Sequence, residues 1–496
     1  MAYREVTVSV SEVPAIRIAV RNEAPVRASG RYVLYWMIAE RRTRWSFPLQ
    51  RARQLADELG LPLVVFEPLG LGYRWASERV HRFVIDGMRD NAAACRAAGV
   101  TYIPWIEPEP RAGAGLLEAL AAYAAVVVTD ERSVSELPLL VERAAAKLSV
   151  RLEAVDGGGI LPLRAAQRTF TMAVHFRRHL QKTLRPHLAE FPVAEPLESY
   201  SGGPASLPDL SRWAAAGPDV VRIERLALDH EVGPVALTGG PVTGGEVLAR
   251  FLESGLGRYA DERNVVEGGA ASGLSPWLHF GHVGAHEVIR KVLDGDGWAP
   301  ERLAEKVTAK RAGWWGASAP VEAFLDECIT WRELGANFCH HTADPYAWES
   351  LPDWARRTME EHADDPRPHL YELAALEAGE THDPLWNAAQ AQLRGEGRIH
   401  NYLRMLWGKK VFEWSPTPRE ALCRLVHLND RWALDGRDPN SAAGIGWVLG
   451  RFDRAWGPER PIFGKLRYMS SDSTRRKLRV RGYVNHWEAT LPARGA

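Results

Sequence analysis

Three tryptophans in the second half of the chain have a spacing that suits electron transfer. Trp407 and Trp414 are seven residues apart, so on a helix they share one face at about 10 Å along the axis. Trp386 precedes them on a separate predicted helix, before a short Gly-Glu-Gly turn. Indoles arranged in this way could pass an electron from one to the next. The same pattern also suits the core of a helical hairpin, in which the indoles only fill space.

Two other segments carry groups that could hold a phosphate-bearing ligand. The segment 268–281 is rich in glycine and serine and runs into a predicted helix. Its N–H and hydroxyl groups could surround a phosphate or simply cap the helix. The segment 428–440, LNDRWALDGRDPN, places Asp435 and Asp438 on a predicted loop. These carboxylates could accept hydrogen bonds from ribose hydroxyls or a ring N–H, or could form caps and turns.

Histidines and basic residues form two further groups. His279, His282 and His286 are three and four residues apart. Gly281 marks a helix start between them, so we predict core and polar roles and no metal site. Residues 465–483 contain seven basic residues and one acidic residue. In a chain of zero net charge this segment could attract phosphate groups or form a solvated charged surface.

The composition limits the class of protein. The chain has 496 residues, 46% of them hydrophobic, with 62 basic and 62 acidic residues. It therefore predicts roughly two to four globular domains and excludes a disordered or uniformly basic protein. The longest apolar run, 119–128, has about half the length of a membrane-spanning helix, and four scattered cysteines exclude a disulfide scaffold. Without a recognisable signal sequence, we expect a cytoplasmic monomer that does not contact a membrane.

The pattern of residues 31–160 predicts an α/β domain. Five short runs rich in β-branched and aromatic residues alternate with helical segments, which is typical of a parallel five-stranded, Rossmann-like sheet. No dinucleotide-binding glycine motif follows the first strand. The expected strands are at 32–37, 61–69, 100–105, 125–131 and 150–156, and the expected helices are near 48–59, 77–98, 113–123 and 137–148.

The rest of the chain divides into three parts. Residues 1–30 form an N-terminal extension, and residues 161–245 form an interdomain linker with frequent glycine and proline in its second half. From 246 to 490 helical periods dominate and predict an all-α domain. Its expected helices are near 246–258, 283–293, 320–338, 352–362, 383–395, 398–413 and 417–428.

Seven blocks of sequence occur in an order that resembles one protein family. They are SGLSPWLHFG, FLDECITWREL, DWARRTM, THDPLWNAAQ, IHNYLRMLWGKKVFEW, LNDRWALDGRDPN and RPIFGKLRYM, and YVLYWM resembles the family's first strand. Together they closely resemble the photolyase and cryptochrome family, specifically the class II cyclobutane pyrimidine dimer photolyases. The resemblance covers most of residues 30–485. It implies an α/β antenna domain, a long linker and an all-helical domain that binds FAD.

The function implied by the resemblance is light-driven repair of pyrimidine dimers in DNA, with fully reduced FAD as the electron source. The dimer would be flipped out of the duplex into the site. The residues that would contact FAD are Tyr259, Ser272, Gly273, Leu274, Ser275, Asn429, Asp435 and Asp438. Among them, Asn429 would face flavin N5.

The resemblance also implies the contacts with the dimer and the path of electrons. Glu327 would donate a hydrogen bond to the dimer carbonyls, provided that burial raises its pKa. Trp331 and Trp447 would form aromatic walls around the dimer, and Met405 would form its apolar floor. Trp456 and Arg467 would contact the surrounding DNA. The tryptophans Trp386, Trp407 and Trp414 would reduce the flavin after light absorption.

Two departures from the family pattern leave alternatives open. The segment 155–180 differs from the family's usual sequence and carries an additional basic, histidine-bearing helix. Whether the protein binds a second antenna chromophore, and whether this is a deazaflavin or a folate, is therefore an open question. Ser441 and Ala442 stand where the family commonly has Gly-Tyr. One alternative is a cryptochrome-like FAD photoreceptor without repair activity, and a weaker one is a light-independent FAD- or DNA-binding protein. If the protein is bacterial, we expect it at the nucleoid.

Overall fold

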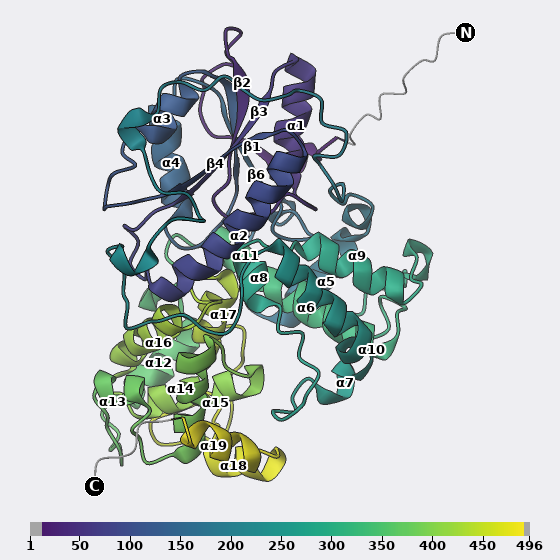
Figure 1. The fold of residues 1–496 in the computed structure, drawn as a ribbon. Helices are drawn as coiled ribbons and strands as arrows, with labels where there is room; N and C mark the ends of the chain where they lie inside the picture. Colours follow the sequence, from purple (N-terminus) through teal and green to yellow (C-terminus); the bar gives the residue numbers. More distant parts are fainter. Residues whose placement is uncertain (1–11, 491–496) are drawn as a thin grey trace.

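Strands with both faces buried build the N-terminal part of the chain in this computed structural model, which describes residues 12–490. Every residue of Tyr32–Trp36 (β2) and Ala124–Asp130 (β5) is buried. Such strands are typical of a parallel sheet between two layers of helices. Figure 1 shows this arrangement, with α1 on one side of the sheet and α3 and α4 on the other.

The remaining elements confirm the predicted α/β domain with its five parallel strands. The strand order is β1-β6-β5-β2-β3-β4, and all neighbours from β6 to β4 are parallel. The other parallel strands are Leu63–Leu69 (β3), Thr101–Ile106 (β4) and Leu152–Val155 (β6), and the helices are Phe47–Leu59 (α1), Glu78–Ala97 (α2), Leu116–Ala121 (α3) and Leu137–Lys147 (α4).

The sheet has one strand more than the five predicted. Ile18–Val20 (β1) pairs antiparallel with β6 at the edge of the sheet. This strand belongs to the predicted N-terminal extension, of which residues 1–11 lie outside the described residues. A three-residue strand is too short to show a periodic pattern, so its strand character depends on the pairing with β6.

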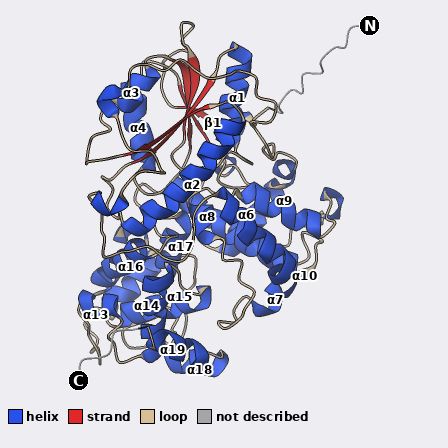
Figure 2. Cartoon of the chain, in the orientation of Figure 1, coloured by secondary structure: helices blue, strands red, loops and turns tan. Residues whose placement is uncertain are grey.

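Helices and loops form the second half, and Figure 2 shows no strand in its described residues. The helices confirm the predicted all-α part and add several short ones, and one helix, at 173–183, lies within the predicted linker. They are Ala173–Thr183 (α5), Pro241–Arg250 (α6), Tyr259–Glu262 (α7), Ser275–His279 (α8), Ala285–Gly295 (α9), Ala319–Leu325 (α10), Arg332–His340 (α11), Asp353–Glu361 (α12), Leu373–Ala378 (α13), Pro384–Glu396 (α14), Asn401–Glu413 (α15), Pro418–Trp432 (α16), Pro439–Val448 (α17), Ser471–Lys477 (α18) and Arg481–Glu488 (α19). Within residues 12–490, no helix has the length and apolar character that crossing a membrane requires.

A π-helical turn interrupts the helix predicted at 320–338. It spans Asp326–Trp331 and connects α10 to α11. Such turns are rare and occur often at functional sites. A single wide turn changes the direction of the side chains that follow it, which a sequence pattern of regular helical period does not reveal.

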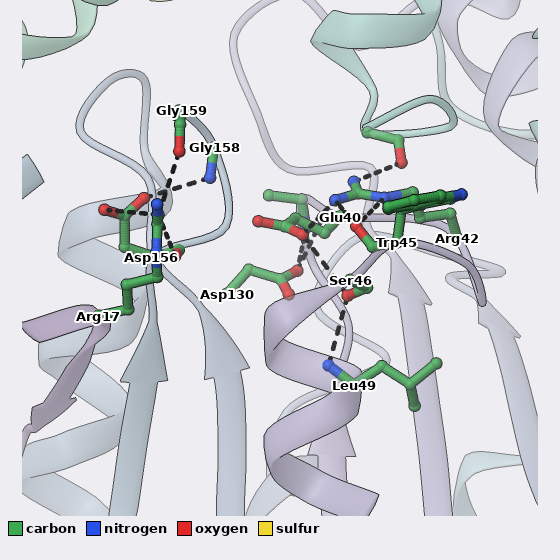
Figure 3. A network of polar contacts seen from close by, with 12 residues as sticks. Arg17, Glu40, Arg42, Trp45, Ser46, Leu49, Asp130, Asp156, Gly158 and Gly159 are labelled. Carbon is green, nitrogen blue, oxygen red and sulfur yellow. Dashed lines mark hydrogen bonds and ion pairs between the residues drawn. The ribbon is translucent and has the colours of Figure 1, made fainter. Parts of the chain in front are cut away.

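Buried polar groups join the α/β domain to the helical part. The Asp130 carboxylate, at the end of β5, accepts three backbone hydrogen bonds from residues 38–40 at 2.6 to 2.9 Å. Glu40 in this loop is ion-paired with Arg42 at 2.6 Å (Figure 3). Arg42 Nη1 also donates to the carbonyl oxygen of Gly281, in the helical part, at 2.9 Å. The loop that follows the central strand β2 is thereby fixed against the segment that precedes α9.

Candidate functional site

A cavity of about 1530 Å³ opens within the helical part. Residues of α7, α8 and the π-helical turn line it, as do residues of α15, α16 and α17. Fourteen of the seventeen predicted site residues lie on its wall: Tyr259, Ser272, Gly273, Leu274, Ser275, Glu327, Trp331, Met405, Trp407, Asn429, Asp435, Trp447, Trp456 and Arg467. Segments that are far apart in the sequence therefore meet at one site.

A glycine-containing loop and two arginines form a polar part of the wall. Gly273 has a φ of +68°, and a Cβ at this position would lie 3.3 Å from Arg398 Nη1. A glycine therefore lets the guanidinium group lie close to the backbone of the loop. Arg404 also lines the cavity and is ion-paired with Asp435 at 2.9 Å. Cations beside backbone N–H groups suit a ligand that carries phosphate.

Asn429 offers a hydrogen-bond acceptor to the cavity. Its side chain, near the end of α16, is 4% exposed. Asn429 Nδ2 donates to Asp430 Oδ1 at 2.9 Å, and this oxygen also accepts from the backbone N–H of Arg437. Because the amide nitrogen is used in this way, the carbonyl oxygen of Asn429 is the atom that can accept a proton donor from a ligand.

Glu327 lies on the π-helical turn and is ion-paired with Arg263. Arg263 Nη1 donates to Glu327 Oε1 at 2.6 Å, and the two side chains are 26% and 31% exposed. Burial raises the pKa of Glu327, and the positive charge of Arg263 opposes this rise. The sequence reasoning missed Arg263. Its position four residues after Tyr259, on the same helical face, is the signal that could have identified it.

The aromatic residues near Glu327 form one continuous surface. The rings of Trp331 and Trp447 have centroids 5.0 Å apart and an interplanar angle of 20°. They are therefore stacked on each other and do not face each other across a gap. The Arg467 guanidinium lies 4.4 Å from the ring centroid of Trp456, and Arg467 Nε donates to Asp453 at 3.1 Å. This surface of rings with an attached cation suits a stacked base next to a phosphate.

The three tryptophans form a connected row that begins at the cavity. Trp407 lines the cavity, and its ring is parallel to that of Trp386, with centroids 6.4 Å apart. Trp386 contacts Trp414 edge-on at 5.5 Å. All three are almost fully buried, and Trp414 also contacts the partly buried Tyr371 at 5.4 Å. The order in space is Trp407, Trp386, Trp414, which differs from the order in the sequence.

Asp438 does not line this cavity, although it was predicted to contact the cofactor. Its Oδ1 accepts from the backbone N–H of Asn440 and caps α17, and its Oδ2 is 3.2 Å from His279 Nδ1. Asp438 therefore positions α17, and it lines a second, smaller cavity rather than this one. Of the other two histidines in the predicted group, His282 accepts from the N–H of Gly240, and His286 is buried.

The sequence is similar to several curated proteins that are named deoxyribodipyrimidine photo-lyase. The protein of Methanothermobacter thermautotrophicus is 34% identical over 461 residues, which are 92% of this chain and 94% of the relative. The protein of Arabidopsis thaliana is 31% identical, over 92% of this chain and 88% of the relative. The protein of Potorous tridactylus is 32% identical, over 90% of this chain and 79% of the relative. No family model matches the sequence.

Two solved structures share the fold. A class III photolyase from Agrobacterium tumefaciens superposes with a TM-score of 0.66 at 17% identity, over 92% of this chain and 86% of the other. A cryptochrome from Synechocystis superposes with a TM-score of 0.65 at 15% identity, over 96% of this chain and 89% of the other. At this low sequence identity the likeness concerns the fold alone. One of the two proteins is named a photolyase and the other a cryptochrome.

Proposed function

Because the chain belongs to the photolyase and cryptochrome family, we propose that it is a class II deoxyribodipyrimidine photo-lyase that repairs cyclobutane pyrimidine dimers in DNA under light. The observation that carries the proposal is the meeting of Glu327, the Trp331–Trp447 stack and Trp407 in one cavity. A light sensor needs a flavin pocket and a tryptophan row. It does not need a partly buried acid beside an aromatic surface on which a damaged base can stack.

The residues of the cavity fit FAD as the cofactor. Its volume of about 1530 Å³ exceeds the roughly 300 to 1000 Å³ of common small-molecule sites, so a dinucleotide and part of a substrate can share it. Arg398 and the loop around Gly273 would hold the phosphates, and Asn429 would accept the N–H of a reduced flavin ring. When bound, FAD would supply the light absorption and the electron needed to split the dimer.

The protein's own contribution would be to bind the dimer, exclude water and donate a hydrogen bond. Trp331 and Trp447 would stack on the flipped-out pyrimidines, since an aromatic surface replaces the stacking lost from the duplex. Neutral Glu327 would donate to a dimer carbonyl oxygen on which negative charge develops. Its raised pKa favours the neutral form that this role requires.

A second cavity, of about 600 Å³, supports the proposal of an additional chromophore. It lies between the ends of β2 and β3 and the helical part, and it is lined by Trp36 and Trp105 from the α/β domain and by Arg437 from the helical part, among others. Arg437 is 9% exposed, and its Nε and Nη2 have no hydrogen-bond partner within residues 12–490. A flat ligand with anionic groups, such as a deazaflavin or a folate, would satisfy both the aromatic lining and this guanidinium group.

The experiment that tests the proposed function compares two light-driven reactions of the purified, FAD-loaded protein. We expect blue light to reduce the flavin, and we expect the reduced protein to restore intact thymines in an oligonucleotide that carries one dimer. The same mixture in the dark and a dimer-free oligonucleotide are the controls. If the flavin is photoreduced but the dimer persists, the protein is a photoreceptor of the cryptochrome type.

A further inference from the structure

The segment that departs from the family's usual text forms a basic helix beside the cavity. Residues 157–189, which overlap this segment (155–180) and extend beyond it, contain six Arg or Lys residues and no Asp or Glu, although the whole chain has equal numbers of both charges. Within this segment, α5 and its preceding residue Met172 line the cavity through Met172–Val174 and Arg177. Val174 is 36% exposed, so α5 begins at the mouth of the cavity and continues along the surface.

Two free cations follow Val174 along the exposed side of α5. Arg178 and Lys182 are spaced four residues apart, so both lie on the same face as Val174, at steps of about 6 Å. Both are exposed, and among the residues described neither has a carboxylate partner. Surface cations without an ion-pair partner contribute a positive potential that attracts a polyanion.

A turn held by Gln181 adds two cations close to α5. Gln181 Oε1 accepts from the backbone N–H groups of Thr308 and Ala309 at 3.0 and 2.7 Å, and its Nε2 donates to the carbonyl oxygen of Lys310 at 3.1 Å. Ala309 has a φ of +60°, an unfavourable conformation for a residue with a Cβ, which these hydrogen bonds stabilise. Lys310 and Arg311 follow directly, and both are exposed and line the cavity.

One acidic residue near this turn, Asp326, is already neutralised by an ion pair. Arg177 binds both of its carboxylate oxygens, at 2.8 and 3.0 Å, and both side chains are less than 10% exposed. Arg311 is 4.0 Å from the same carboxylate and 68% exposed, so its guanidinium group is available to a ligand. The buried ion pair therefore leaves the surface above it positive.

We propose that Arg178, Lys182, Lys310 and Arg311 form a basic shelf at the mouth of the cavity that binds the sugar-phosphate backbone of duplex DNA beside the flipped-out dimer. The inference rests on the proposed function, because it takes damaged DNA as the occupant of the cavity. Duplex DNA carries about one negative charge per 1.7 Å of axis, so it can engage cations that are spread along a helix. Contacts with phosphates set the position of the duplex, while the cavity recognises the lesion.

The shelf is tested by removing its two charges on α5 in the full-length, FAD-loaded protein. The double variant Arg178→Gln with Lys182→Gln should bind a dimer-containing duplex on the order of 10-fold more weakly at low salt, because two phosphate contacts are lost. The slope of log Kd against log salt concentration should fall by about 2. A single-stranded tetranucleotide that carries the dimer has few phosphates on either side of the lesion, so it makes fewer contacts with α5. Its affinity should fall less than that of the duplex.

A matched variant controls for the general loss of positive charge. Arg96 and Arg111 are exposed, lie in the α/β domain and do not line the cavity. The variant Arg96→Gln with Arg111→Gln should leave duplex binding within about twofold. In a second test, Gln181→Leu keeps every cation but releases the turn, and it should weaken duplex binding while the tetranucleotide still binds. If Gln181→Leu does not fold, the double variant on α5 still decides the question.

The shelf is refuted if the α5 variant binds the duplex with the affinity and salt slope of the parent, or if the control variant loses as much. Failure of the proposed function has a different signature, because the parent protein would then repair neither the duplex nor the tetranucleotide. Binding of undamaged duplex would still test the shelf in that case, since its phosphates are the same.

Discussion

Replacing Arg263 by methionine should extend dimer repair to higher pH. Arg263 Nη1 lies 2.6 Å from Glu327 Oε1, and its positive charge favours the ionised form of Glu327, whereas burial favours the neutral acid. Methionine is similar in length to the aliphatic part of the arginine side chain, but it carries no charge. The pKa of Glu327, which burial already raises, should then rise further.

The size of this change follows from the partial exposure of the pair. The two side chains are 26% and 31% exposed, so water screens the interaction, and a value of about 1 kcal/mol is reasonable. Since one pKa unit corresponds to about 1.36 kcal/mol, the pKa of Glu327 should rise by about 0.7 of a unit. In the proposed reaction the neutral acid is the donor, so activity is lost as the pH rises through this pKa. The midpoint of that loss should move upward by the same amount.

The assay is the initial rate of dimer repair under saturating light at pH values from about 5 to 10. The flavin is reduced chemically beforehand, so that photoreduction does not limit the rate. Arg258→Met is the control, because it removes the exposed ion pair between Arg258 and Glu262 in the neighbouring turn and should leave the midpoint unchanged. If Arg263→Met lowers the rate equally at every pH and the midpoint stays in place, Glu327 is not the titrating donor and the reasoning is wrong.

Three further variants test the other residues of the site. Trp386→Phe should stop photoreduction, since it removes the indole between the other two. FAD binding and repair by the chemically reduced protein should stay intact. The control is Trp348→Phe, at another buried tryptophan, and this variant should photoreduce its flavin like the parent. Glu327→Gln should bind damaged DNA normally and repair it on the order of 10- to 1000-fold more slowly, and an unchanged rate would exclude its role as proton-sharing donor. Asn429→Leu should retain FAD but destabilise its reduced form by about 1 to 3 kcal/mol, because a buried N–H loses its acceptor. A redox titration measures this, and a parent-like potential would point to Asn440, which also lines the cavity.

The amino-acid sequence by itself determined the elements of both halves of the chain. The strands at Leu63–Leu69 and Ala124–Asp130 and the helix at Glu78–Ala97 lie where their patterns predict them. This succeeds because the period of apolar residues in a strand or helix is a property of a few neighbouring residues. The resemblance to a family of known fold then identified a set of site residues, most of which meet in one cavity. Their roles stay predictions.

Only the tertiary structure decided which side chains become partners. Glu327 and Arg263 are 64 residues apart in the sequence, and the Trp331–Trp447 stack joins the π-helical turn to α17. Each pair depends on how two helices pack, and a sequence pattern shows the face of a helix but not its neighbour. Asp438 lies outside the large cavity for the same reason, since its capping of α17 and its contact with His279 fix the position of the carboxylate. A side chain's type sets the bonds that it can make, whereas the packing of distant elements sets which of those bonds it makes.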